Sequence, residues 1–215
     1  EALIKFFRRI SEGYYFIKEK KNVLLPFLIM LALQVSMAMV VVNVPLVATE
    51  ILKVSVNSAG TLIVVPAAIG AALAGFLIPK TLRKGIRKKA VIEYSLMFLG
   101  FLLFTLGFIV PEITNGLRIV IAFITVMAIG FSIVGIFIPA QTFLQEATPG
   151  GMRGRVFGNF WFLVTVATIL PVVFSATLIE ILGVRSLFLI LGALSFFGLV
   201  FSKRYGQRII EHGAI

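Results

Sequence analysis

The sequence predicts an all-α, polytopic membrane protein that crosses the bilayer six times. Of its 215 residues, 60% are hydrophobic and only 13% are charged, and the mean hydropathy is +1.08. A soluble domain needs more polar surface than this composition supplies, whereas lipid accepts apolar side chains on every outward face. The apolar residues also fall into six runs of about 20, the length that a helix needs to cross a hydrocarbon core roughly 30 Å thick.

The chain starts with an N-terminal arm, residues 1–22, in which aromatic and aliphatic residues such as Phe6, Phe7 and Tyr14 are interspersed with basic ones. This pattern is typical of an amphipathic helix on the inner membrane surface, although an ordinary linker helix before the first span fits equally well. The predicted spans are residues 23–48, 58–78, 90–110, 117–140, 156–181 and 186–202, followed by a polar tail at 203–215. The breaks between them contain the Gly, Pro, Asn and charged residues that are expected of loops.

Basic residues are distributed unevenly among these breaks. They lie in the arm, the second loop, the fourth loop and the tail, with three exceptions, Lys53, Arg118 and Arg185. Because basic loops stay in the cytoplasm, the sequence predicts that both termini are cytoplasmic. An even number of spans agrees with this topology.

The composition also excludes several classes of function. Cys and Asp are absent and His212 is the one histidine, so a metal site or a His-based catalytic site has almost no material. We therefore expect no enzyme activity, no metal and no cofactor. The net charge of +11 would suit nucleic acid. However, the charges lie at helix ends, where lipid headgroups account for them, so the expected partner is the bilayer and not nucleic acid.

Four of the six spans are expected to line a cavity or to pack together. The first, second, fourth and fifth contain internal Pro, and polar residues occur in three of them, whereas the third and sixth are rich in Phe and Leu and are expected to face lipid. Buried amides and freed carbonyls need protein or water as neighbours. The candidate cavity residues are Gln34, Asn43, Ser132, Trp161, Thr165, Thr168 and Ser175. For the two threonines, hydrogen bonds within their own helix are an equally good interpretation.

Two further features concern packing and charge. Ala67, Ala71 and Gly75 recur every four residues, which predicts a close helix–helix approach along that face. Glu180 is the acid most clearly inside a span and is a candidate protonation site. The simpler interpretation is that its carboxylate reaches the outer interface near Arg185.

The polar loops resemble those of a known family. The passage from Gly75 to Lys89, with Arg83, Gly85 and Arg87, resembles the loop signature of the major facilitator superfamily, in which a Gly and an acid precede basic residues around a second Gly. Here Pro79 stands where the acid would be, as in the degenerate copy in the second half of these transporters. The passage from Pro139 to Phe157 resembles the loop between the tenth and eleventh helices of the macrolide-efflux and siderophore-exporter branch. The arm resembles the linker that enters the seventh helix.

This resemblance implies the C-terminal six-helix half of a twelve-helix transporter, built as two inverted three-helix repeats and working by alternating access. The implied partner is the missing N-terminal half of the same protein, and the chain is expected to be a piece of it. In such transporters the seventh, eighth, tenth and eleventh helices line the central cavity, while the ninth and twelfth face lipid. The proline and polar content of the spans gives the same two groups, with four spans at the cavity and two that face lipid.

The loops that carry the resemblance are candidate gating elements. Gly75, Arg83, Gly85 and Arg87 belong to the first. In the second, Glu146 lies within reach of Arg153 and Arg155, and such a pair could hold the inner helix ends together in one state and release them in the other. A static loop whose arginines only set the topology is the alternative interpretation.

The predicted function is secondary active export of amphipathic small molecules, drug-like or siderophore-like, by alternating access and with proton antiport. The predicted location is the plasma membrane of a prokaryote. A lipid or metabolite carrier of the same fold, or a membrane scaffold or receptor that transports nothing, is the alternative.

Overall fold

The computed structural model describes residues 21–211, and within this part six helices are long and apolar enough to cross a membrane. The predicted amphipathic arm lies almost entirely outside the described residues. The helical elements are α2 (Lys21–Val42), α3 (Val44–Leu46), η1 (Val47–Ile51), η2 (Val56–Ser58), η3 (Gly60–Val64), α4 (Val65–Arg83), α5 (Lys88–Phe104), η4 (Thr105–Ile109), η5 (Val110–Glu112), α6 (Asn115–Ala147), α7 (Gly150–Leu182) and α8 (Val184–Glu211). The all-helical, six-span fold class is therefore confirmed.

Prolines explain where the first three spans depart from simple helices. Three short π-helical stretches, η1, η3 and η4, each lie within a few residues of a proline: Pro45, Pro66 or Pro111. Proline has no N–H to donate and displaces the carbonyl four residues before it. For Pro66 and Pro111 this carbonyl lies inside η3 and η4, so the hydrogen-bond register shifts there to the wider π form. For Pro45 it is the Val41 carbonyl, which lies before η1 and two residues before Asn43. As a result the first predicted span, 23–48, is interrupted at Asn43.

The last three spans are longer than predicted. Helix α6 continues past residue 140 to Ala147, and α7 starts at Gly150 and not at 156. Only Thr148 and Pro149 separate the two helices, because the residue before a proline disfavours the helical conformation. Helix α8 extends beyond residue 202 into the predicted tail.

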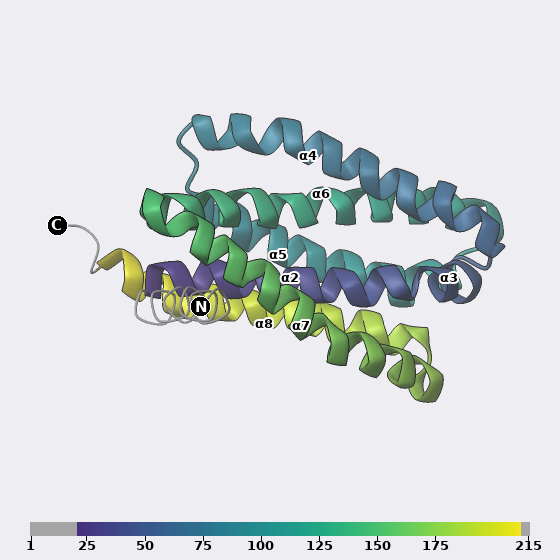
Figure 1. Cartoon of the computed structure of the whole chain (residues 1–215). Coiled ribbons are helices and arrows are strands. Elements are labelled where there is room, and N and C mark those ends of the chain that lie inside the picture. Colours follow the sequence, from purple (N-terminus) through teal and green to yellow (C-terminus); the bar gives the residue numbers. More distant parts are fainter. Residues whose placement is uncertain (1–20, 212–215) are drawn as a thin grey trace.

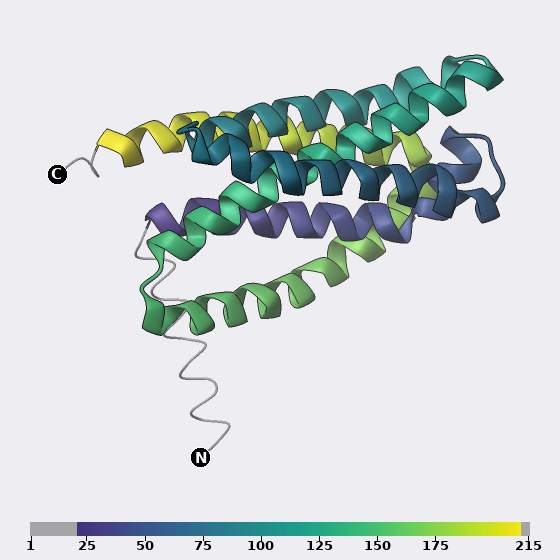
Figure 2. The same ribbon diagram turned by 90° about the horizontal axis from the view of Figure 1, so that it is seen from above.

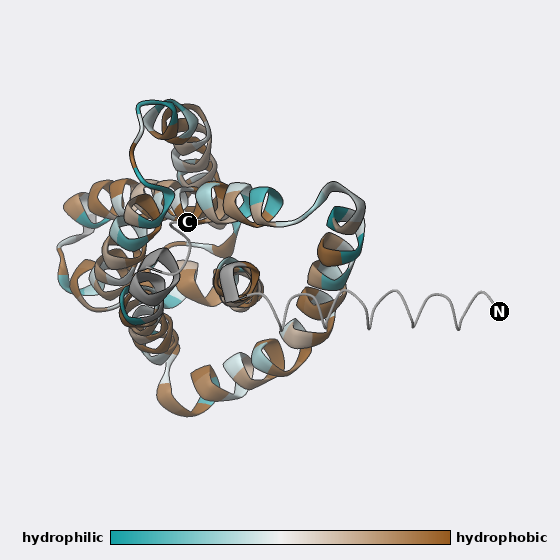
Figure 3. Cartoon of the chain, turned by 90° about the vertical axis from the view of Figure 1, so that its left-hand side faces the viewer, coloured by the Kyte–Doolittle hydropathy of each residue, from teal (hydrophilic) through white to brown (hydrophobic). Residues whose placement is uncertain are grey.

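The helices form a layered bundle around α6 and α2. Helix α4 packs on α6, α6 also packs on α5 and α2, α5 packs on α8, and α2 packs on α7 (Figures 1 and 2). The elements α3, η1, η2 and η3 lie at the end of the bundle opposite to the described start of α2. Seen along the bundle, most of the helical ribbon consists of hydrophobic residues (Figure 3). Many of the large ones are exposed, as expected for a protein surrounded by lipid.

Glycines allow the closest approach in the bundle, between α4 and α6. A Cβ atom on Gly70 would lie 1.8 Å from the carbonyl oxygen of Met127, and one on Gly130 would lie 2.1 Å from that of Ala67. The buried stripe of α4 is Pro66, Gly70, Ala74 and Ile78. This stripe lies one position away from the predicted one, Ala67, Ala71 and Gly75. Of the predicted residues, Ala67 contacts α6, whereas Gly75 has open space around it.

Helices α5 and α8 also interlock, and this changes the expectation that both face lipid. The Ser195 hydroxyl donates a 2.7 Å hydrogen bond to the Leu96 carbonyl, and Gly100 leaves room for the ring of Phe196. Gly107, in the following element η4, leaves room for Phe188 of α8. Half of the most apolar stretch of the third span, Lys88–Glu112, is buried inside the bundle, which is the largest buried share among the six spans. The outward aromatic side chains of α5 remain exposed, so this helix faces lipid along one side only.

Candidate functional site

The structure brings two predicted cavity residues, Asn43 and Ser175, into direct contact. The Asn43 amide nitrogen donates to the Ser175 hydroxyl oxygen at 2.9 Å and to the Met39 carbonyl at 2.7 Å. The backbone N–H of Asn43 bonds to Val40, so the side chain satisfies the carbonyl that this N–H would meet in a regular α-helix. Both side chains are buried, with exposures of 3% for Asn43 and 0% for Ser175.

The predicted aromatic and hydroxyl stripe of α7 becomes less exposed from Trp161 towards Ser175. Trp161 is 53% exposed and Thr165 is also exposed, whereas Thr168 is half-buried. The two threonine hydroxyls donate to carbonyls of their own helix, those of Trp161 and Thr165. The intrahelical interpretation therefore describes these two residues in this structure, and the stripe offers a ligand mainly apolar surface.

The other two cavity candidates lie apart from this contact. Ser132 is buried on α6 and donates to the Ala128 carbonyl of its own helix. Gln34 is half-buried in the middle of α2. Hydroxyl groups that bond back to their own helix are satisfied without a ligand, so Ser132 is part of the close-packed face of α6.

An aromatic cluster joins α2 to α7 nearer the start of both helices. The rings of Phe27 and Phe160 meet edge to face with centroids 5.5 Å apart, and Phe160 meets Trp161 at 5.4 Å. Phe160 is buried and Trp161 is not. This geometry favours the attraction between ring edges and faces, and it holds Trp161 at the rim of the packed core.

The gating prediction needs a correction. Glu146 forms its ion pair with Lys88, at the start of α5, and not with Arg153 or Arg155. Arg153 instead donates to the Thr148 carbonyl at 3.2 Å, and Arg155 donates to the Met152 sulfur at 3.5 Å. The physical reason is that Arg153 lies in the first turn of α7 and bonds back to the residue before this helix's N-terminal proline, whereas the end of α6 lies against the start of α5. Helices α5 and α6 are thus linked by charge at this end.

The remaining candidates of the first loop lie on the surface. Gly75, Arg83, Gly85 and Arg87 are all exposed. Gly85 has a φ of +84°, a conformation that residues with a Cβ atom rarely adopt, so glycine is required for the turn between α4 and α5. Gly85 and Arg87 lie in the loop between α4 and α5, whereas Gly75 lies within α4 and Arg83 is its last residue.

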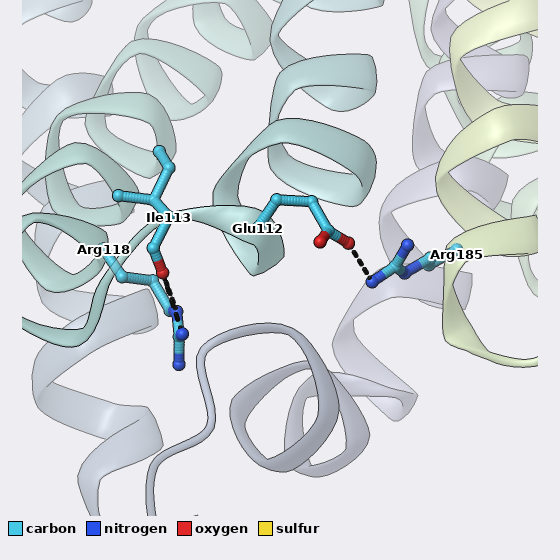
Figure 4. A network of polar contacts seen from close by, with 4 residues as sticks. All are labelled: Glu112, Ile113, Arg118 and Arg185. Atoms are coloured by element: carbon cyan, nitrogen blue, oxygen red, sulfur yellow. Dashed lines mark hydrogen bonds and ion pairs between the residues drawn. The ribbon is translucent and has the colours of Figure 1, made fainter.

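Glu180 is exposed near the end of α7, and no partner was found for it among the described residues. The expected neighbour Arg185 instead donates to Glu112 at 2.7 Å, joining the start of α8 to η5 (Figure 4). In the same loop, the Arg118 guanidinium donates twice to the Ile113 carbonyl, at 3.1 and 2.8 Å. Arg118 and Arg185 therefore organise this loop, a role that the distribution of charge did not predict.

Sequence reasoning also missed a polar contact between α5 and α8. The Ser202 hydroxyl donates to Glu93 at 3.1 Å, and Lys89 pairs with the same carboxylate at 3.5 Å. The signal was available in part, because Lys89 and Glu93 are four residues apart and face the same side of a helix. Between residues 21 and 211, no group of three or more His, Cys, Asp or Glu side chains could hold a metal ion.

Comparison with known protein families identifies the superfamily. The family model described as Major Facilitator Superfamily matches residues 5–170, which include the described part of α2 and everything up to the middle of α7. Neither curated proteins nor solved structures gave a match. The match covers most of the sequence and agrees with six apolar helices. The chain therefore belongs to the major facilitator superfamily of membrane transporters.

Proposed function

We propose that this chain is the C-terminal six-helix half of a secondary active exporter of amphipathic small molecules, which works by alternating access and is driven by proton antiport. The supporting observation is the surface of α7 together with the Asn43–Ser175 contact. The buried Asn43 amide bonds to the hydroxyl of Ser175 on α7, and the exposed side chains of α7 before this residue are mostly apolar. Pockets for lipophilic ligands combine a large apolar wall with a few placed polar groups.

The partner in this proposal is an N-terminal six-helix half, which would cover the open side of α7. A cavity between the halves would then be lined by α2, α4, α6 and α7, and Trp161 and Thr165 would face it. The drug-like or siderophore-like class of cargo rests on the resemblance of the loop between α6 and α7 to that branch of the family. The exporter would lie in the plasma membrane of a prokaryote with both termini in the cytoplasm.

Proton coupling in this proposal needs a titratable acid that reaches the medium from a span. Glu180 is the acid of this chain that we assign to it, because the carboxylate lies near the end of a span and is exposed. A carboxylate at such a position can exchange a proton with the outer medium while its helix moves.

Transport into proteoliposomes tests the proposal. The transporter that contains this chain is reconstituted with an imposed pH gradient, and accumulation of the fluorescent dye ethidium is measured with and without a protonophore. We expect accumulation that the protonophore abolishes and that Glu180→Gln reduces, while Glu50→Gln, also an acid near the outer side, leaves it unchanged. Accumulation that persists with the protonophore would contradict antiport, and uptake of a lipid or metabolite without dye transport would favour the carrier alternative. No transport of any solute would favour a scaffold or receptor.

A further inference from the structure

The connection between α4 and α5 has a large excess of positive charge. Six of the ten residues at positions 80–89 are Lys or Arg. Two of the six are neutralised, since Lys88 pairs with Glu146 of α6 and Lys89 pairs with Glu93 of its own helix. Both of these pairs lie at the start of α5, so they leave the charge at the end of α4 and in the loop uncompensated.

The remaining four cations form what we call the basic cluster: Lys80, Arg83, Lys84 and Arg87. All four are exposed, and within residues 21–211 none of them has an acidic partner. No acidic residue occurs at positions 51–92 of the sequence either. The negative end of α4 balances only about half of one charge. The like charges that remain repel one another, so the basic cluster favours an anionic ligand.

Exposed apolar side chains place the basic cluster at the surface of the membrane. Phe76, one turn earlier on α4, is 63% exposed, and the Lys80 ammonium lies 3.6 Å from the centre of its ring. Ile86 is exposed in the loop itself. An exposed Phe on a spanning helix contacts lipid, so an ammonium above its ring lies at the depth of the lipid headgroups. An anion that meets the cluster at this depth belongs to the membrane.

The other basic residues at the same end of the bundle are arranged differently. Arg153 and Arg155, at the start of α7, each donate to a group of the chain itself. Lys203 and Arg204 are exposed on α8, close to the start of α5, but they are two adjacent residues of one helix. The excess charge is therefore concentrated in the basic cluster.

We propose that the basic cluster binds the headgroup phosphate of an anionic phospholipid. The φ of +84° at Gly85 turns the chain tightly, so Lys84 and Arg87 lie on either side of a short loop. Both donate to the phosphate oxygens, Arg87 through its planar fork. Phe76 and Ile86 contact the acyl chains of the same lipid.

This site is separate from the proposed export of amphipathic molecules. It lies at one end of the bundle and on the helix that packs against α6, whereas the Asn43–Ser175 contact joins α2 to α7. Lipid binding can be measured on the chain without any transport. The two proposals can therefore fail independently of each other.

The attraction should distinguish an anionic lipid from a zwitterionic one. Each Lys or Arg close to an anionic membrane surface strengthens binding by about fivefold. In phosphatidylcholine the ammonium of the headgroup itself neutralises the phosphate, so this gain is small. We therefore expect the basic cluster to prefer phosphatidylglycerol over phosphatidylcholine.

Fluorescence quenching by brominated lipids tests this preference in a bilayer. The chain contains no Cys, so the full chain can be labelled with bimane at Leu77→Cys, close to the cluster, or at Val65→Cys, near the other end of α4. Both positions are 45% exposed. The chain is reconstituted in phosphatidylcholine vesicles with a small fraction of brominated phosphatidylglycerol or brominated phosphatidylcholine. The two quenching curves give the association constant of the anionic lipid relative to the zwitterionic one.

We expect this relative association constant to be well above one at residue 77 and close to one at residue 65. Lys84→Gln and Arg87→Gln should each lower the value at residue 77 by about fivefold. Both side chains are exposed, so the Tm of the chain should not change. The matched control is the double variant Lys203→Gln/Arg204→Gln, which removes two exposed cations at the same end and should leave the value unchanged.

Three results would overturn the proposal. Equal values at residues 77 and 65 would show that no anionic lipid gathers at the cluster. An equal loss in the Lys203→Gln/Arg204→Gln variant and in the Lys84→Gln/Arg87→Gln variant would show diffuse attraction without a site. Finally, inorganic phosphate is added at constant ionic strength, and a lower value at residue 77 would assign the site to phosphate in solution and not to lipid.

Discussion

Replacing Gly70 with Ala tests the packing that organises the whole bundle. The added Cβ would lie 1.8 Å from the Met127 carbonyl oxygen, whereas ordinary contacts begin at 3.4 Å, so α4 and α6 must separate by about 1.6 Å or distort. Overpacking of this kind costs about 1–3 kcal/mol, and the blocking atom here is backbone, which cannot rotate away. Alanine recovers roughly 1 kcal/mol through its higher helix propensity. Taking the upper end of the overpacking range, about 3 kcal/mol, and subtracting this gain, we expect a net loss of about 2 kcal/mol.

The assay is thermal unfolding in detergent, followed by circular dichroism. A loss of about 2 kcal/mol corresponds to a decrease in Tm of roughly 4–8 °C for a chain of this size. Gly75→Ala is the matched control on the same helix, because its Cβ meets nothing within 4 Å, and its Tm should stay level or rise. A Gly70→Ala chain as stable as the Gly75→Ala chain would refute the reasoning.

A second substitution sharpens the same test. Gly130→Ala meets Ala67 from the opposite helix, so it should destabilise the chain in the same direction. Separation of α4 and α6 relieves both clashes at once, and the double variant should therefore lose less than the two single losses together. Fully additive losses would show that the two glycines do not share one contact.

Two other contacts make separate predictions. In a double-mutant cycle, Asn43→Ala and Ser175→Ala should show a coupling free energy of about 0.6 kcal/mol, the mean for hydrogen bonds between membrane helices, and zero coupling would contradict the contact. For the inner ion pair, Lys88→Gln and Glu146→Gln should each lower the free energy of unfolding by about 0.2–1 kcal/mol and should be coupled, because the pair is partly exposed. The effects of Glu146→Gln and Arg153→Gln on the free energy of unfolding should be additive. Coupling between these two effects would favour the Glu146–Arg153 pair that the sequence predicted.

Much of the fold could be predicted because lipid imposes a simple rule on length and composition. Six apolar runs predicted six spans, and the structure has them. The partners could not be predicted in the same way. The predicted stripe, Ala67, Ala71 and Gly75, has a spacing of four residues. The stripe that is buried has the same spacing and starts one residue earlier, at Pro66. Spacing alone does not decide which of two neighbouring faces meets another helix, since that depends on how α4 is rotated after the π turn of η3.

For the candidate site too, the residues could be predicted but their contacts could not. Asn43 and Ser175 were both predicted as cavity residues, because amides and hydroxyls are rare inside apolar spans, but their direct contact depends on the break at Asn43. Glu146 was expected to form an ion pair with an arginine nearby in the sequence. In the structure it pairs with Lys88, which lies 58 residues away in the chain. Charge complementarity is not specific enough to rank several cations, and the choice follows from which helix ends meet.

The position of each polar contact decides what it can do during a transport cycle. The pairs Lys88–Glu146 and Arg185–Glu112 lie at helix ends and are partly exposed, so water or headgroups can replace either partner with little loss of free energy. The Asn43–Ser175 contact is buried, and breaking it would leave two polar groups without partners in an apolar surrounding. Contacts of the first kind can be exchanged between states, whereas the second kind persists. We therefore expect alternating access to exchange the ion pairs at the ends of the bundle while Asn43 and Ser175 stay together.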